Sequence, residues 1–175
     1  MEQKPISVWK SSATSGVYIG IVLILISVIF YVSGNTFAKS SQYIGYVVMI
    51  MGVIYAQINF RKLLGGEMTY GQAFGAGVIS MLFASILSGI YTYVLYKIID
   101  PSLQEQLRLF TEEQIVKQGR VSEEQIDMAV EMAAKFQKPI MMLIFAIIGG
   151  TLIGLIISLI TSIFTQKKPS EEIVE

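Results

Sequence analysis

The sequence predicts an all-α integral membrane protein with four transmembrane helices and an amphipathic helical insert between the third and fourth helices. The 175 residues are 53% hydrophobic and only 15% charged, whereas about a quarter of the residues in a soluble domain are charged. Residues 11–38, 40–60, 68–96 and 139–166 contain no Asp, Glu, Lys or Arg. Each stretch can cross a hydrocarbon core, which takes about 20 helical residues. Eight of the thirteen acidic residues lie within residues 100–131, which marks the insert.

The first helix is expected at residues 14–34. Its apolar run from Gly16 to Val32 is longer than the roughly 7–15 residues of a signal-peptide core, and another span follows, so we expect the segment to be retained. Upstream, Trp9 stands between Lys4 and Lys10, an arrangement typical of an anchor at the membrane–water interface.

The second and third helices are expected at residues 42–60 and 71–99. The third is longer than a bilayer requires, so it must tilt or project beyond the membrane. Polar groups gather at its start, at Glu67, Tyr70 and Gln72. They either contact a headgroup or partner, or mark an interfacial helix start with Thr69 or Tyr70 near the cap.

The fourth helix is expected at residues 139–165, because proline suits the first turn of a helix, and a charged tail follows at residues 166–175. Together these segments form a single membrane domain over residues 1–175. Four crossings place both termini on one face, with six basic residues near helix ends, against seven more widely spaced ones on the other face. We therefore expect a multi-pass inner-membrane protein with both termini cytoplasmic.

The extramembrane segment, residues 100–138, contains the sequences TEEQ and SEEQ, which fit the capping box and predict helix starts at Thr111 and Ser122. Gly119 would end the first of these helices. The apolar side of the segment comprises Leu103, Leu107, Phe110, Ile126, Val130 and Phe136. This side either packs on itself, the helix ends or the headgroups, or contacts a protein partner. Its paired glutamates do not predict a metal site, because adjacent residues on a helix do not face one ligand.

Small residues recur at helical spacing in two of the expected spans. They are Ala73, Gly77, Ala84 and Ser88 in the third helix, and Ala146, Gly150, Gly154 and Ser158 in the fourth. Small side chains let helix backbones approach closely within a bilayer. The stripes therefore predict either packing of the third helix on the fourth within one subunit, or a seam between subunits of a homo-oligomer.

The composition excludes several classes of function. With no cysteine and no histidine, the chain lacks disulfides, thiolate chemistry and imidazole catalysis. No expected span contains an ionisable Asp, Glu, Lys or Arg, the usual mark of pumps and proton relays. A net charge of zero argues against nucleic acid as a partner. We therefore predict no catalytic, cofactor-binding or metal-binding residues, and membrane lipids as partners.

Four ordered elements, MTYGQAFGAGVIS, YKIIDPSLQEQL, SEEQIDMAVEMAAKFQKP and GGTLIGLIISLI followed by KK, resemble a Bacteroidota membrane-protein family catalogued as domain of unknown function 4199. The likeness covers nearly the whole chain. It implies a four-helix inner-membrane protein with a charged helical segment before the last span. Genes of such proteins can lie near a polyprenyl-phosphate glycosyltransferase gene, which implies a setting in envelope biogenesis. The family supplies no catalytic residues to transfer.

These observations favour a non-enzymatic accessory or scaffold protein that presents a helical segment outside the membrane. The alternative is an oligomeric transporter or channel subunit for a lipid or an uncharged solute. Its path would be lined by Ser80, Ser88, Thr92, Ser158 and Thr161. A membrane enzyme acting on lipids is disfavoured by the missing histidine, cysteine and buried acids.

Overall fold

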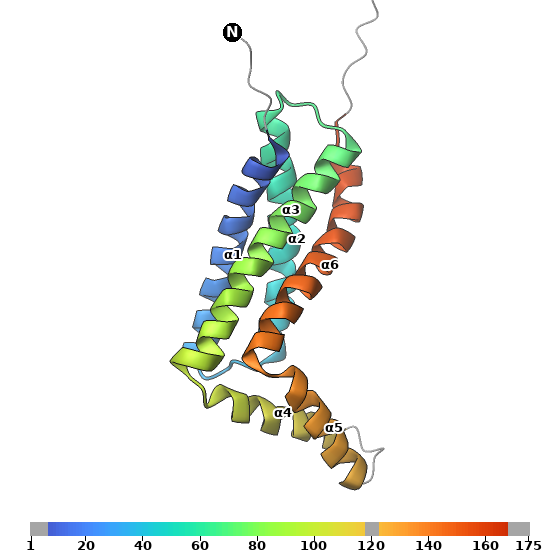
Figure 1. Ribbon diagram of the computed structural model, residues 1–175. Helices are drawn as coiled ribbons and strands as arrows, with labels where there is room; N and C mark the ends of the chain where they lie inside the picture. Colours follow the sequence, from blue (N-terminus) through green and yellow to red (C-terminus); the bar gives the residue numbers. More distant parts are fainter. Residues whose placement is uncertain (1–6, 118–122, 168–175) are drawn as a thin grey trace, which may run out of the picture.

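The computed structural model describes residues 7–117 and 123–167, and all of its named elements are helical (Figure 1). A bundle is formed by α1 (Val8–Val32), α2 (Lys39–Leu63), α3 (Tyr70–Val94) and α6 (Pro139–Thr165). Two shorter helices, α4 (Leu103–Lys117) and α5 (Glu123–Phe136), form a hairpin beyond one end of the bundle. All four bundle helices are long and apolar enough to cross a membrane, so the predicted fold class is confirmed.

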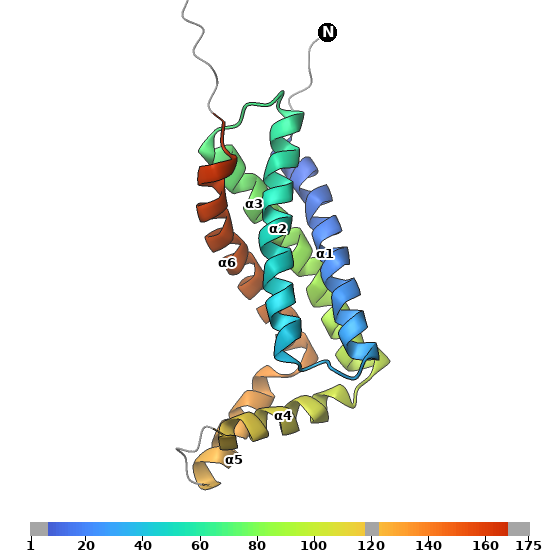
Figure 2. The same cartoon turned by 180° about the vertical axis from the view of Figure 1, so that it is seen from behind.

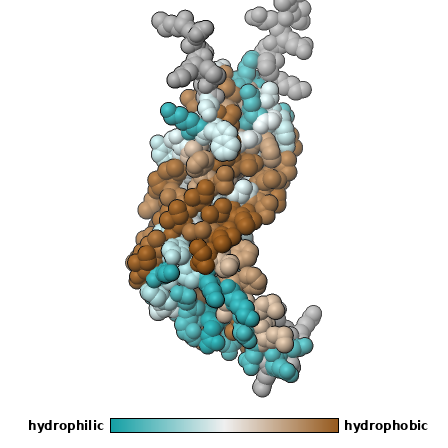
Figure 3. Space-filling view, viewed as in Figure 1, coloured by the Kyte–Doolittle hydropathy of each residue, from teal (hydrophilic) through white to brown (hydrophobic). Residues whose placement is uncertain are grey.

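The bundle places the α2–α3 turn at the same end as residues 7 and 167, and the hairpin at the opposite end (Figures 1 and 2). Helix α3 packs against all three other long helices, most extensively against α6. On the face that Figure 3 shows, hydrophobic side chains cover the bundle and hydrophilic surface lies beyond them over the hairpin. An apolar exterior of this kind is what a bilayer solvates.

Three helix boundaries differ from the predicted ones by several residues. Helix α1 begins at Val8 rather than at residue 14, and α2 extends from Lys39 to Leu63 rather than over residues 42–60. The predictions used charge as the limit of a helix, whereas charge limits only the part that lies in lipid. Basic residues in the last turn of α2 suit the negative end of its dipole. The predicted bounds of α6 are confirmed.

Helix α3 begins with a reciprocal cap. The Thr69 side chain accepts a hydrogen bond from the Gln72 backbone N–H at 3.3 Å, and the Thr69 backbone N–H donates to Gln72 Oε1 at 2.9 Å. This capping box satisfies two backbone donors that a helix start leaves open. The expected helix start near Thr69 is therefore confirmed.

Past Val94, α3 continues into a π-helical turn, Leu95–Ile99, closed by a hydrogen bond from Asp100 N–H to the Leu95 carbonyl at 2.8 Å. The helical span therefore runs from Tyr70 to Ile99, in agreement with the expected extent. The change of pitch at its end is not visible in the sequence pattern.

The predicted helix start at Thr111 is wrong, because α4 runs through this residue without a break. The Thr111 hydroxyl donates to the Leu107 carbonyl one turn earlier, at 2.8 Å. A cap requires a non-helical residue, and Leu103 has already started the helix after the Asp100–Pro101 turn. The predicted cap at Ser122 and the predicted stop at Gly119 lie outside the described residues.

Candidate functional sites in the bundle and the hairpin

Small residues allow α3 and α6 to pack closely along an antiparallel seam. A Cβ atom added at Gly154 would lie 2.6 Å from Met81 Cγ, and one added at Gly150 would lie 3.0 Å from Ser85 Cβ. Towards the hairpin, Ala146 Cβ is 3.5 Å from the Cβ position of Gly89. Successive contacts are four residues apart on both helices, so α6 places a glycine or alanine opposite α3 at each turn of the seam, which allows the two helices to approach closely. The seam joins helices of one subunit.

At the other end of the seam, Gly77 faces Ser158 of α6, and a Cβ there would also lie 2.9 Å from Val53 Cγ1 of α2. Ala73 is fully buried in a cluster with Phe60 and Met68. Gly77 therefore brings three helices together, and it does so next to the fully buried Ser158.

The predicted small-residue stripe of α3 is divided between neighbours. Ala84 faces α1, because a Cβ at Gly20 would lie 3.3 Å from Ala84 Cα. The Ser88 hydroxyl is buried without a hydrogen-bond partner among the described residues. The small residues of α3 thus contact α1 as well as α6, because α3 packs against all three other long helices.

A buried polar cluster joins α2 to α6 near the end of the bundle that holds residues 7 and 167. Gln57 is fully buried; its Nε2 donates to Ser162 Oγ at 3.0 Å, and its Oε1 accepts from Thr165 Oγ1 at 2.9 Å. One turn along α2, the Arg61 guanidinium donates to the Thr165 carbonyl at 3.0 Å. Each polar atom of the buried amide has a partner, as a low-dielectric core requires.

This cluster was not predicted, because a neutral glutamine leaves no mark in the charge pattern of the span. An amide in an apolar span, four residues before an arginine at the helix end, is the signal that could have revealed it. None of its buried groups titrates near neutral pH. The cluster is suited to holding helices together by hydrogen bonds and not to acid–base chemistry.

A short backbone bridge reinforces the same end. The backbone groups of Met68, in the α2–α3 turn, and Lys167, just after α6, exchange hydrogen bonds of 2.8 and 2.9 Å. Together with Arg61, this bridge ties the end of α6 to α2 and to the following turn.

The hydroxyl groups proposed to line a transport path are mostly bonded to backbone carbonyls of their own helices. Ser80 donates to Ala76, Thr92 to Ser88 and Thr161 to Ile157. Both Ser80 and Ser158 are completely buried. In this conformation these two side chains are packed in the core of the bundle.

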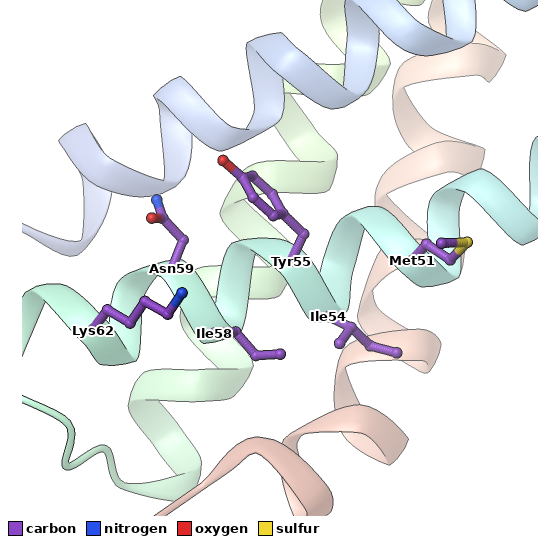
Figure 4. A pocket seen from close by; sticks show the side chains of 6 residues that line it. All are labelled: Met51, Ile54, Tyr55, Ile58, Asn59 and Lys62. Atoms are coloured by element: carbon purple, nitrogen blue, oxygen red, sulfur yellow. The ribbon is translucent and has the colours of Figure 1, made fainter.

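A cavity of about 430 Å³ lies instead on the outer face of α2. Figure 4 shows its lining side chains along that one helix: Met51, Ile54, Tyr55, Ile58, Asn59 and Lys62. The polar ends of Asn59 and Lys62 lie towards the end of the helix, and the apolar residues lie deeper in the span. Such an arrangement suits a lipid chain with its headgroup near Lys62.

Contacts from three elements hold the hairpin against the bundle. Tyr31 of α1 donates its hydroxyl to Asp100 Oδ2 at 3.2 Å, and Gln104 of α4 donates to the Tyr96 carbonyl at 3.1 Å. The rings of Phe37 and Phe110 stack with centroids 5.3 Å apart. The base of α4 is therefore fixed to α1, the α1–α2 turn and the end of the third span.

Asp100 is the polar centre of this attachment. The Ser102 hydroxyl donates to Asp100 Oδ1 at 2.5 Å, and the bond from Ser102 lowers the pKa of the Asp100 carboxyl. Partial desolvation opposes this shift, and the Tyr31 hydroxyl adds to it. Asp100 therefore stays ionised near neutral pH and continues to accept both hydrogen bonds.

The six apolar residues proposed as a partner contact have different environments. Leu103 and Val130 are buried, Leu107 packs against the cluster of Leu95, Tyr96 and Leu103, and Phe110 stacks on Phe37. Ile126 is half-buried, and the exposed Phe136 meets the ring of Phe145 in α6 edge to face at 5.8 Å. Packing within the chain thus accounts for at least three of them: Leu103, Leu107 and Phe110.

A different set of apolar side chains remains uncovered on the hairpin. Met128 and Met132 of α5 are 62% and 56% exposed, and Leu109 and Val116 of α4 are each 52% exposed. Figure 3 shows α5 as a paler, less hydrophilic area beside the polar surface of α4. The spacing of four residues between the methionines places them on one side of α5.

Among residues 7–117 and 123–167, no three His, Cys, Asp or Glu side chains are grouped so that they could hold a metal ion. The comparisons with known proteins give one result. The model of the family described as "Protein of unknown function (DUF4199)" matches residues 14–167. No curated protein and no solved structure matches the chain.

Proposed function

The chain belongs to this family of unknown function, and we propose that it is a non-enzymatic accessory or scaffold protein that presents its α4–α5 hairpin to a protein partner outside the membrane. One observation carries the proposal: the bundle holds the base of the hairpin, while Met128 and Met132 of α5 remain exposed. A fixed base keeps the exposed side in one orientation, which lowers the entropy lost on binding. Methionine side chains adapt to varied partner surfaces.

The partner is proposed to be another protein rather than a second copy joined through the predicted small-residue stripes. Gly77, Gly150 and Gly154 already make close contacts within the subunit. A homo-oligomer would therefore have to use a different face of the bundle. The surface proposed to bind the partner is therefore formed by the exposed apolar side chains of the hairpin, among them Met128 and Met132.

Exchange of the two exposed methionines should test this role. We expect a Met128→Gln, Met132→Gln variant, purified from its native membranes, to retain at least about fivefold less of the partner protein that co-purifies with the natural chain. A fivefold decrease corresponds to the loss of about 1 kcal/mol of binding free energy at an interface. The measurement is quantitative mass spectrometry of the co-purified proteins.

The matched control changes two exposed acidic residues of the same helix with the same spacing, Asp127→Asn and Glu131→Gln, which lie about 100° around the helix from the methionines, and should retain the partner. An unchanged set of proteins in the methionine variant would refute the scaffold role. Solute flux into liposomes containing this chain alone would indicate the transporter alternative, and turnover of a lipid-linked substrate would indicate an enzyme.

We further propose that the protein lies in the inner membrane, acts in envelope biogenesis and has both termini in the cytoplasm. The closely spaced basic residues near the end of the bundle that holds residues 7 and 167 support this orientation. The hairpin would then lie on the far side of the membrane.

The absence of cysteine allows a direct test of the orientation. Single-cysteine variants at Ser7 and Ser33, both exposed and at opposite ends of α1, can be treated in intact cells with a membrane-impermeant maleimide. We expect labelling at Ser33→Cys and none at Ser7→Cys until the inner membrane is permeabilised. The reverse pattern would invert the proposed topology.

A further inference from the structure

A second cavity, of about 340 Å³, lies where the third span, α4 and α6 meet, at the hairpin end of the bundle. Its lining residues are Tyr93, Lys97, Gln104, Lys138, Pro139 and Ile140. They come from the end of the third span, from α4 and from the start of α6 with the residue before it. The attachment of the hairpin to the bundle therefore creates this cavity.

The cavity is positively charged. The Lys97 ammonium lies 5.5 Å from the centre of the Tyr93 ring, and Lys138 lines the same cavity without any acidic residue beside it. Within the described part of the chain, the ion pairs of the hairpin use Arg108, Lys117 and Lys135 and leave Lys97 and Lys138 unpaired. Asp100, close to Lys97 in sequence, is occupied by Tyr31 and Ser102. Two unpaired ammonium groups around one hollow favour an anionic ligand.

The position of the cavity is that of the lipid headgroups. Lys97 directly follows the charge-free residues 68–96, and Lys138 directly precedes the charge-free residues 139–166. Ile140 is half-exposed on the wall, and Ile144 and Ile148 continue an exposed apolar surface along α6. A ligand seated between the lysines would thus meet polar groups at one end and a lipid-facing helix at the other.

We propose that this cavity binds the phosphate of an anionic phospholipid, with Lys97 and Lys138 contacting the phosphate and the outer surface of α6 contacting an acyl chain. A phosphate group suits two ammonium groups that line one cavity, as a charge-assisted acceptor. A lipid satisfies both the charged and the apolar parts of the site, whereas free inorganic phosphate would use only the lysines.

The test uses the full chain in a neutral detergent, mixed with equal amounts of phosphatidylglycerol and phosphatidylcholine that carry the same acyl chains. Native mass spectrometry counts the lipids that stay bound. The natural chain should bind more phosphatidylglycerol than phosphatidylcholine. In the Lys97→Gln, Lys138→Gln variant the ratio of the two bound lipids should fall by about tenfold or more, because each lysine near a membrane surface contributes appreciably to the binding of an anionic lipid.

The matched control is Lys10→Gln, Lys167→Gln, which removes the same charge from exposed lysines at the other end of the bundle and should keep the preference. The proposal is overturned if the preference survives in the Lys97, Lys138 variant, or falls equally in the control. If inorganic phosphate at the lipid's own concentration displaces the lipid, the site binds free phosphate and the lipid assignment is wrong.

Circular dichroism of each variant checks that the helices are retained. Should the double variant fail to fold, Lys138→Gln alone gives the same decision, because the exposed Lys138 side chain makes no hydrogen bond or ion pair within the described residues. A single exchange should reduce the preference by a smaller factor, and no reduction at all would again overturn the proposal.

Discussion

A Gly154→Leu variant is expected to unfold at a temperature about 3–10 °C lower than the natural chain, because the new side chain would overlap Met81 in the seam between α3 and α6. A Cβ atom alone would come within 2.6 Å of Met81 Cγ, and leucine adds three further carbons. Either α6 moves away from α3 or Met81 leaves its fully buried position. Overpacking of this kind costs about 1–3 kcal/mol.

Gly149→Leu is a closely matched control, because it makes the same exchange one position away on the same helix, where an added Cβ meets nothing within 4 Å. Its side chain would point towards lipid, so the unfolding temperature should stay within about 2 °C of the natural value. Thermal unfolding in detergent, followed by circular dichroism, measures both variants. Equal stability of the two would show that α3 and α6 do not pack as closely as the seam requires.

A Gln57→Ala variant is expected to lose about 1–3 kcal/mol of stability, because it removes the hydrogen bonds to Ser162 and Thr165 and leaves a cavity in the core. Hydrogen bonds between membrane helices contribute about 0.6 kcal/mol each on average. The rest of the cost comes from lost packing at a fully buried position. The free energy of unfolding can be measured by denaturation in mixed micelles.

The control for this exchange is Gln42→Ala, which alters an exposed glutamine near the start of the same helix and should change stability by less than about 0.5 kcal/mol. A double-mutant cycle with Thr165→Val tests the bond itself, since the two exchanges should cost less together than the sum of their separate effects. Strict additivity would mean that Gln57 and Thr165 do not interact.

The crossings could be predicted from the sequence because the exclusion of charge from lipid acts along the chain and needs no knowledge of neighbours. Residues 139–166 are free of charge, and α6 fills Pro139–Thr165 within them. The position of the hairpin followed from its acidic residues in the same way. Helix ends that extend into water were harder to predict, because a charged residue such as Lys39 can belong to a helix without belonging to the membrane.

Which neighbour each face of a helix contacts was harder to predict, because this depends on how the helices are arranged around one another. Helix α3 contacts three other helices, so two residues of one stripe have different neighbours. Ala84 lies against α1, whereas Gly77 lies against α2 and α6. The same reasoning explains the hairpin: Leu103 was chosen as a partner contact for its apolar character, and that character buries it in the chain's own core. Gln57 was missed because burial of a neutral amide leaves no trace in the charge pattern.

The π-helical turn at Leu95–Ile99 has a consequence for insertions and deletions in related chains. A π turn contains about one residue more than an α turn, so it takes up an extra residue while the chain on either side keeps nearly the same face. Deleting one residue within this turn would therefore leave Asp100 and the start of α4 close to their present direction, whereas a deletion in the regular part of α3 would rotate everything beyond it by about 100° around the axis of the span. The turn is thus the part of the third span where a change of chain length by one residue disturbs the attachment of the hairpin least.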